Sequence, residues 1–255
     1  MSDTALSRAQ RERFARNGFI VLREAVPQTL LDEARAAVGE TVPEDLSDFE
    51  AMAAGPEDRH YWNDLDEMAP FRPLNDLLQE YAEELVGAGR VAPPGEFTQV
   101  AVRYPTGKFP GDPDRPMTTT HGNPHVDIFD ESGELQPFTV AATTYLADVH
   151  PRSGGLTVWP GTHWGVAEYL SEHGLETFSN EQVKQVLHPQ ASPFEVCGPA
   201  GTVVLWHNSL VHTGGSHLGR EPRIASFTRF MRHDEEETSH DAATHPFKYF
   251  CGVDT

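Results

Sequence analysis

The sequence predicts a mainly β fold with flanking helices, of the sandwich or jelly-roll type. From about residue 96 onwards, short runs of β-branched and aromatic residues alternate with glycine and proline. This is the pattern of short antiparallel strands joined by turns. No helical segment alternates regularly with these runs, as a parallel α/β sheet would require. The chain is also long enough, at 255 residues, for one domain with a sizeable core.

The first 95 residues differ from the rest and are expected to form a mainly helical support. Residues 7–16 carry helix-forming side chains, and Gly18 follows as a C-terminal stop. Residues 19–22 (Phe-Ile-Val-Leu) are expected to form a short buried strand, and Pro27 opens a second helix. The apolar face of that helix would consist of Leu30, Leu31, Ala34 and Val38.

The jelly-roll core is expected over residues 96–232, and residues 233–255 would complete a single 255-residue domain as a C-terminal tail. A helix over residues 166–186 would be an insertion between strands. The segment 105–124, rich in Pro, Gly, Thr and Asp, would be an irregular loop that leads into His125 and could act as a lid. The candidate strands are residues 97–104, 125–129, 138–148, 156–159, 194–197, 202–206 and 223–232.

Charge and cysteine content narrow the range of partners. A net charge of −20 argues against nucleic acid, whose phosphates need a basic surface, and against anionic membranes. Two cysteines are too few for a disulfide framework, and the first residues lack the pattern of a signal peptide. We therefore expect a cytoplasmic protein that acts on a small-molecule substrate, with neither nucleic acid nor membrane as partner. The acidic run 233–237 is expected to be solvated surface.

His125-Val126-Asp127 is the only His-x-Asp triplet in the chain. On a strand, residues two apart point to the same face, so His125 and Asp127 could bind one ion. Two histidines and one carboxylate form the ligand set of mononuclear non-haem iron(II) oxygenases. The triplet alone is weak evidence, because a chain with 13 histidines is expected to contain on the order of one by chance.

His121 and His125 are four residues apart, a spacing that on a helix would suggest a zinc pair. The Gly-Asn-Pro between them breaks any such helix, so we expect His121 to lie in a loop. The sequence also lacks a His-Glu-x-x-His motif, which disfavours a zinc hydrolase.

The third ligand is expected just after the apolar strand 202–206, where both His207 and His212 follow. We prefer His212, because Arg223 comes eleven residues later at the start of another apolar strand. A guanidinium that enters a buried strand needs an anionic partner, since a lone buried charge costs several kcal/mol. A carboxylate can pair with it through two hydrogen bonds. That carboxylate belongs either to an acidic residue or to a ligand.

Several motifs together resemble the phytanoyl-CoA dioxygenase (PhyH-like) family of Fe(II)/2-oxoglutarate-dependent oxygenases. Residues 14–23 are similar to the family's helix, Asn-Gly-Phe turn and strand, and residues 153–163 are similar to its Pro-Gly-Thr-His segment. The interval from His212 to Arg223 matches the family's spacing between the last metal ligand and the 2-oxoglutarate arginine. The resemblance covers most of the chain and implies a double-stranded β-helix, a cupin-like jelly roll.

The resemblance also implies roles for individual residues. Arg223 would anchor the distal carboxylate of 2-oxoglutarate, and Thr143 falls where the family has a residue near this co-substrate. Gly214 stands where relatives often have a hydroxyl residue, and Thr213 and Ser216 are candidates to replace it. Independently of the family, Arg103 could meet an anionic group of the co-substrate or the substrate. The resemblance further implies that the Fe(II) ligands are His125, Asp127 and His212.

The implied reaction consumes O2 and 2-oxoglutarate, releases succinate and CO2, and by default hydroxylates a small metabolite or natural-product intermediate. Related halogenases replace the carboxylate ligand with a small residue, so Asp127 disfavours halogenation. Trp159, Trp206 and Asn208 are candidates for the pocket wall. Two alternatives stay open: a cupin-like metalloprotein, either an isomerase or a cofactor-free dioxygenase, which would not require Arg223, and a non-catalytic relative that binds a ligand. The substrate, the regiochemistry and the oligomeric state are not predicted.

Overall fold

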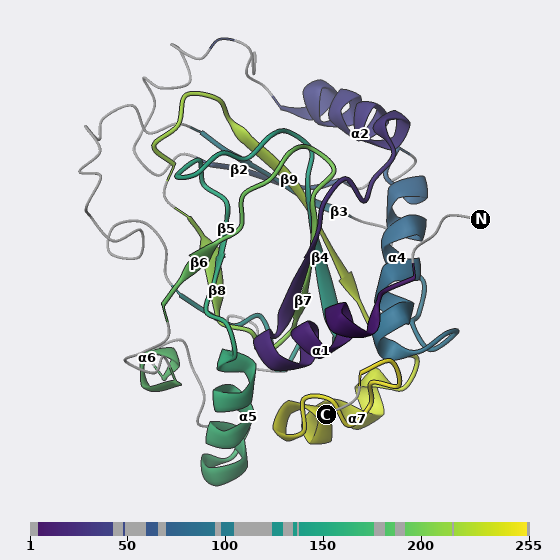
Figure 1. Cartoon of the computed structure of the whole chain (residues 1–255), viewed down its shortest axis with the longest axis vertical. Helices are drawn as coiled ribbons and strands as arrows, with labels where there is room; N and C mark the ends of the chain where they lie inside the picture. Colours follow the sequence, from purple (N-terminus) through teal and green to yellow (C-terminus); the bar gives the residue numbers. More distant parts are fainter. Residues whose placement is uncertain are drawn as a thin grey trace.

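Two antiparallel sheets face each other in the computed structural model, and helices pack around them (Figure 1). The predicted mainly β fold with flanking helices is therefore confirmed. The structure describes residues 5–42, 48, 60–65, 70–94, 98–104, 124–129, 135–136, 138–175, 182–186, 192–215 and 217–253.

The larger sheet contains six strands in the order β1-β7-β4-β9-β3-β2, and each strand runs antiparallel to its neighbours. Its strands are β1 (Phe19–Leu22), β2 (His60–Leu65), β3 (Thr98–Arg103), β4 (Val140–Tyr145), β7 (Val203–His207) and β9 (Arg223–Phe230). The smaller sheet has the order β6-β5-β8. Its strands are β5 (Leu156–Val158), β6 (Phe194–Glu195) and β8 (His212–Gly214).

Alternate residues of the larger sheet serve two different cores, as the period of two along a strand requires. Val140, Ala142 and Leu205 pack outward against α2 (Gln28–Thr41) and α4 (Arg72–Val86), which cover that face in Figure 1. The inward-facing residues share a second core with Leu156 and Val158 of the smaller sheet. These inward residues are Ala141, Tyr145, Val204, Trp206 and Ala225. The space between the sheets is where the candidate site lies.

The N-terminal elements form as their sequence predicts. Helix α1 (Arg8–Asn17) begins with a capping box at Ser7 and ends at Gly18, whose φ of 80° is left-handed. A Cβ at Gly18 would lie 2.6 Å from His163 Nδ1, so both the backbone and the available space require glycine. Helix α2 follows Pro27 and buries Leu31, Ala34 and Val38.

Two predicted elements differ from the structure. Residues 125–129 are not a strand: His125 and Phe129 form only isolated bridges, and the chain turns at residues 127–128 between them. The helix predicted over residues 166–186 starts earlier and is divided into α5 (Thr162–His173), which ends at Gly174, and the short α6 (Val183–Val186). The predicted lid loop, apart from Pro124, and His121 lie outside the described residues.

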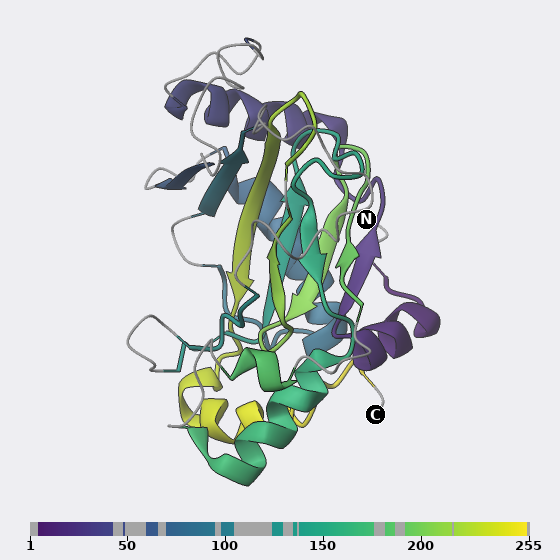
Figure 2. The ribbon, with the colours of Figure 1, turned by 90° about the vertical axis from the view of Figure 1, so that its left-hand side faces the viewer.

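The C-terminal residues form helix α7 (Glu235–Thr244), which lies beside α5 at one end of the sheets (Figures 1 and 2). The prediction that residues 233–237 are solvated surface is wrong at Glu235, which is only 2% exposed. Its Oε2 lies 2.9 Å from Nη1 of the equally buried Arg232 and accepts a hydrogen bond from Thr139. The ion pair explains the burial, because a lone buried charge would be unstable. No described helix combines the length and apolar character needed to cross a membrane.

Replacing Glu235 with alanine is expected to lower the free energy of unfolding by about 3 kcal/mol, because it leaves the buried Arg232 without its closest buried partner. The measurement is urea unfolding followed by circular dichroism. Glu236→Ala, on the exposed side of the same turn, is the matched control and should change the free energy by less than about 0.5 kcal/mol. Equal effects of the two substitutions would show that the Arg232 pair does not stabilise the fold.

Candidate metal centre and co-substrate pocket

His125 and His212 lie opposite each other although 87 residues separate them in the chain. Their backbones form an isolated antiparallel bridge, in which each N–H donates to the other's carbonyl oxygen at 3.0 Å. Residues opposed in this way carry their side chains close together on one face. The two imidazole ring centroids are accordingly 4.5 Å apart. His212 begins β8, so the small sheet fixes this half of the site.

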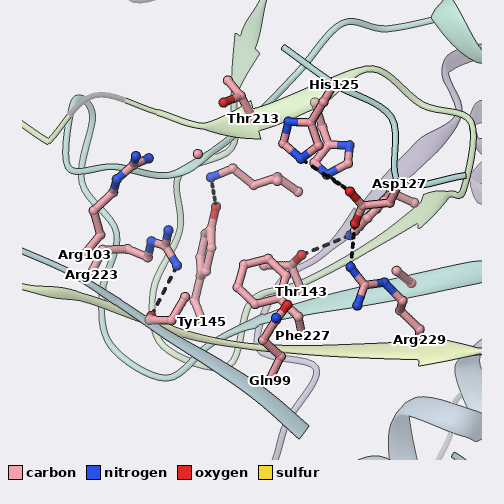
Figure 3. A pocket seen from close by; sticks show the side chains of 16 residues that line it. Gln99, Arg103, His125, Asp127, Thr143, Tyr145, Thr213, Arg223, Phe227 and Arg229 are labelled. Atoms are coloured by element: carbon pink, nitrogen blue, oxygen red, sulfur yellow. Dashed lines mark hydrogen bonds and ion pairs between the residues drawn. The ribbon is translucent and has the colours of Figure 1, made fainter. Parts of the chain in front are cut away.

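Asp127 completes the cluster from the turn that follows His125 (Figure 3). Its Oδ1 lies 3.3 Å from His125 Nε2 and 3.8 Å from His212 Nε2. One donor atom from each residue lies within 4.8 Å of the other two. A transition metal at about 2.0–2.2 Å from nitrogen and oxygen ligands brings neighbouring donors to about 3 Å. The three side chains therefore fit a single ion after small movements, and the predicted set is brought together.

The protonation states of His212 and Asp127 also suit a metal. His212 Nδ1 lies 2.9 Å from the Leu210 carbonyl oxygen, which as an acceptor requires the proton on Nδ1 and leaves the Nε2 lone pair for a metal. Burial lowers the pKa of His212 to about 4, so the ring is neutral near pH 7. Burial alone would raise the pKa of Asp127. Its interactions with His212, His125 and Arg229 outweigh burial and hold the pKa well below its usual range.

Arg229 is a site residue that the sequence analysis did not assign. Its Nη2 lies 2.7 Å from Asp127 Oδ2, on the side of the carboxylate away from the histidines (Figure 3). A sequence signal was present, because Arg223 and Arg229 are six residues apart on the predicted strand and so share a face. The sequence could not show which acid Arg229 would meet.

A cavity of about 370 Å³ opens between the sheets beside this cluster. The three clustered residues line one part of it, and arginine side chains line another (Figure 3). All the predicted metal and co-substrate residues line this same cavity, namely Arg103, His125, Asp127, Thr143, His212 and Arg223.

Arg223 is 5% exposed and points into the cavity from the start of β9. Its Nε donates to the Gly154 carbonyl oxygen at 3.0 Å, and its guanidinium carbon lies 5.9 Å from the Phe227 ring centroid. Burial lowers its pKa to about 10, which still leaves it charged near pH 7. Among the described residues no carboxylate forms an ion pair with Arg223. The sequence left open whether the carboxylate that pairs with Arg223 belongs to an acidic residue or to a ligand. The described residues favour a ligand.

Arg103 stands opposite Arg223 in the register of β3 and β9. Its Nη1 donates to the Gly215 carbonyl oxygen at 2.7 Å. A Cβ at Gly214 would clash with the same nitrogen, so any side chain there would displace Arg103. The guanidinium thus occupies the space where relatives are expected to carry a hydroxyl group. Thr213 lines the cavity, and Ser216 lies outside the described residues.

Thr143 is fully buried on the inner face of β4. Its Oγ1 accepts a hydrogen bond from Trp206 Nε1 at 3.0 Å, which leaves the hydroxyl hydrogen free to donate to a ligand in the cavity. Trp206 lines the cavity as predicted.

The other two predicted wall residues lie elsewhere. Trp159 packs in a separate apolar cluster. Asn208 is directed to the Phe138 carbonyl oxygen at 2.6 Å. Both follow the ends of strands, where the chain has turned away from the cavity. The wall residues that the sequence analysis missed include Gln99, Tyr145 and Phe227.

Two other buried histidines, His207 and His163, have structural partners. His207 is buried, and its Nε2 lies 2.9 Å from the Pro246 carbonyl oxygen. His163, near the start of α5, lies 3.0 Å from the Ala15 carbonyl oxygen through Nε2. Neither lines the cavity.

Comparison with known proteins places the chain in a family. Residues 14–225 match the family described as Phytanoyl-CoA dioxygenase (PhyH). Among solved structures, SnoK from nogalamycin biosynthesis, a non-heme alpha-ketoglutarate-dependent carbocyclase, is similar at a TM-score of 0.61 and 17% identity, over 91% of this chain and 86% of its own. EctD from S. alaskensis, with 2-oxoglutarate and 5-hydroxyectoine, is similar at a TM-score of 0.59 and 20% identity, over 92% of this chain and 79% of its own.

HygX from Streptomyces hygroscopicus, with nickel and 2-oxoglutarate bound, is similar at a TM-score of 0.54 and 18% identity, over 89% of this chain and 87% of its own. These likenesses confirm the jelly-roll fold. No curated protein matches the sequence significantly. The family match covers most of the chain and does not depend on the distant structures. The chain therefore belongs to the phytanoyl-CoA dioxygenase (PhyH) family and is a non-haem Fe(II)- and 2-oxoglutarate-dependent oxygenase.

Proposed function

We propose that the protein hydroxylates a small-molecule metabolite or natural-product intermediate, with 2-oxoglutarate and O2 as co-substrates and succinate and CO2 as by-products. One observation carries the proposal: the cluster of His125, Asp127 and His212 shares a cavity with Arg223, a buried cation that has no carboxylate partner among the described residues. We also propose that the whole chain acts as one oxygenase domain.

The metal would be held by His125 Nε2, Asp127 Oδ1 and His212 Nε2, which leaves three positions for other ligands. When bound, iron and 2-oxoglutarate supply the oxidising chemistry, and the protein supplies binding, orientation and exclusion of water. Asp127 supplies the carboxylate ligand that related halogenases replace with a small residue, so hydroxylation is favoured over halogenation.

Arg223 would receive the distal carboxylate of 2-oxoglutarate in the part of the cavity that the arginines line. A buried guanidinium and a carboxylate form a strong, geometrically defined pair when both are shielded from water. Arg103 lies beside it and would add positive charge for the same ligand, while the Thr143 hydroxyl would donate a hydrogen bond. Leu156 and Phe227 line the cavity with apolar surface that helps to exclude water.

The size of the cavity supports a small substrate. A volume of about 370 Å³ is near the lower end of the range of about 300–1,000 Å³ for small-molecule sites, and it must also hold 2-oxoglutarate. SnoK belongs to nogalamycin biosynthesis, and the EctD structure contains 5-hydroxyectoine, so similar folds act on or bind small metabolites. A metabolite screen that measures substrate-stimulated release of succinate would identify the substrate. We infer a cytoplasmic location from the low cysteine content.

Adding Fe(II) and 2-oxoglutarate to the protein without oxygen is expected to produce the weak visible charge-transfer band of a chelated keto acid. The reason is that the cluster and Arg223 together offer a site for both ends of the co-substrate. Absorption spectroscopy under anaerobic conditions makes the measurement, with succinate in place of 2-oxoglutarate as the control. A wild-type protein that shows no band at saturating 2-oxoglutarate would contradict the proposed function.

A further inference from the structure

Arg229 separates the roles of the two oxygens of Asp127. The Oδ2 atom receives Arg229 Nη2 at 2.7 Å, whereas Oδ1 is the oxygen that faces the two histidines. We propose that Arg229 is a positioning residue that restricts Asp127 to binding the metal through Oδ1 alone, and thereby keeps coordination positions open for the co-substrate. This inference rests on the proposed metal site.

The fold holds Arg229 in a well-defined place. It lies on β9, which has β4 on one side and β3 on the other, and it pairs in register with Ala141 of β4. Its guanidinium carbon lies 5.5 Å from the Phe138 ring centroid, and its Nε is buried and makes no hydrogen bond with any described residue. The ion pair with Asp127 at 2.7 Å has the length of a charge-assisted hydrogen bond. A donor fixed to an internal strand therefore resists rotation of the carboxylate.

The number of oxygens that Asp127 uses determines how many positions remain. A carboxylate can bind a metal through one oxygen or through both. With two histidines and one carboxylate oxygen as ligands, three positions would be left for other ligands, and a chelating keto acid would need two of them. If Asp127 turned and used both oxygens, only two positions would be left, and the second carboxylate oxygen would compete with the keto acid for the metal. Loss of Arg229 should therefore impair binding of the keto acid more than binding of the metal.

The metal itself should be retained for an electrostatic reason. Removing the positive charge of Arg229 makes the site more attractive to a cation, which offsets the loss of carboxylate positioning. This gives the inference a signature that a merely structural role would not produce: metal affinity is preserved while chelation of the keto acid is weakened.

The test uses Arg229→Met, in which methionine keeps an apolar stem but lacks the charge and the donors. Anaerobic calorimetry measures the dissociation constant of Fe(II), and the charge-transfer band measures that of the keto acid. We expect the Fe(II) constant to stay within about tenfold of wild type and the keto-acid constant to rise about 10–100-fold. Arg229→Lys should restore most of the loss, because an ammonium group can still donate to Oδ2. Arg8→Met, at an exposed arginine paired with Glu12, is the matched control and should change neither constant.

Pyruvate separates this role from that of Arg223, because it chelates through the same keto and carboxylate groups but lacks the distal carboxylate. Weaker binding of both pyruvate and 2-oxoglutarate to Arg229→Met supports the inference. Weaker binding of 2-oxoglutarate alone would overturn it, since Arg229 would then act on the distal carboxylate. Unchanged keto-acid binding, or loss of Fe(II) itself, would also overturn it. Failure of the proposed function is distinguishable, because wild type would then bind no keto acid. Should Arg229→Met not fold, Arg229→Leu carries the same comparison, because leucine also lacks the charge and the donors.

Discussion

Asp127→Ala is expected to abolish succinate formation and to weaken Fe(II) binding by more than about 100-fold. A residue that only supports a ligand through a hydrogen bond typically contributes up to about 100-fold to metal affinity. Loss of a ligand should cost more, because Asp127 Oδ1 is the one anionic donor in the cluster. Removing it leaves two imidazoles as ligands and leaves the positive charge of Arg229 without its carboxylate partner, so that this charge repels the metal ion. Calorimetry of Fe(II) binding and chromatographic measurement of succinate make the test.

Asp32→Ala is the matched control, because Asp32 lies on the exposed side of α2, where it pairs with Arg35. This variant should bind Fe(II) and form succinate as wild type does. An Asp127→Ala protein that keeps wild-type affinity for Fe(II) would remove Asp127 from the ligand set.

Arg223→Ala is expected to weaken 2-oxoglutarate binding by about 30-fold to about 4,000-fold, while Fe(II) binding changes little. Loss of one partner of a buried, hydrogen-bonded charge pair costs about 2–5 kcal/mol, and about 1.4 kcal/mol corresponds to a factor of ten. Arg223 has the burial that this estimate assumes. The dissociation constant of 2-oxoglutarate is measured from the anaerobic charge-transfer band.

The exposed Arg220, three residues earlier, provides the control Arg220→Ala, which should bind 2-oxoglutarate normally. Pyruvate should bind wild type and Arg223→Ala with similar affinity, because it has no distal carboxylate to lose. If Arg223→Ala lost Fe(II) rather than 2-oxoglutarate, the residue would have to be assigned to the metal site instead.

The fold could be predicted largely from local patterns. Strands such as β4 and β9 lie in runs of β-branched and aromatic residues separated by turn residues, which is the pattern from which they were predicted. The strand expected over residues 125–129 was wrong because an isolated bridge to the distant His212 and another to the nearby Leu135, not local propensity, determine the path of the chain. Helix α7 was missed because its polar sequence has no apolar period. Its N-terminal end is held by the buried pair of Glu235 and Arg232, which involves side-chain contacts that local patterns do not contain.

The candidate site, like the fold, could be predicted from the sequence only in part. The histidine and aspartate positions, and the interval to Arg223, were predicted from motifs and family resemblance, and the structure brings these residues to one cavity. The role of Arg229 was not predicted, because its partner lies 102 residues away in the chain. The position of the Arg103 guanidinium, in the space beside Gly214, likewise depends on how two distant segments lie together. Spacing could show that these arginines face inward, but only the fold shows what each one meets.

A crystal structure of the protein with Fe(II) and 2-oxoglutarate, grown without oxygen, tests the central claim most directly. Anomalous scattering should locate one iron ion about 2.0–2.2 Å from His125 Nε2, Asp127 Oδ1 and His212 Nε2. The distal carboxylate of 2-oxoglutarate should lie against Arg223. Iron bound at another place, or bound without Asp127, would contradict the account.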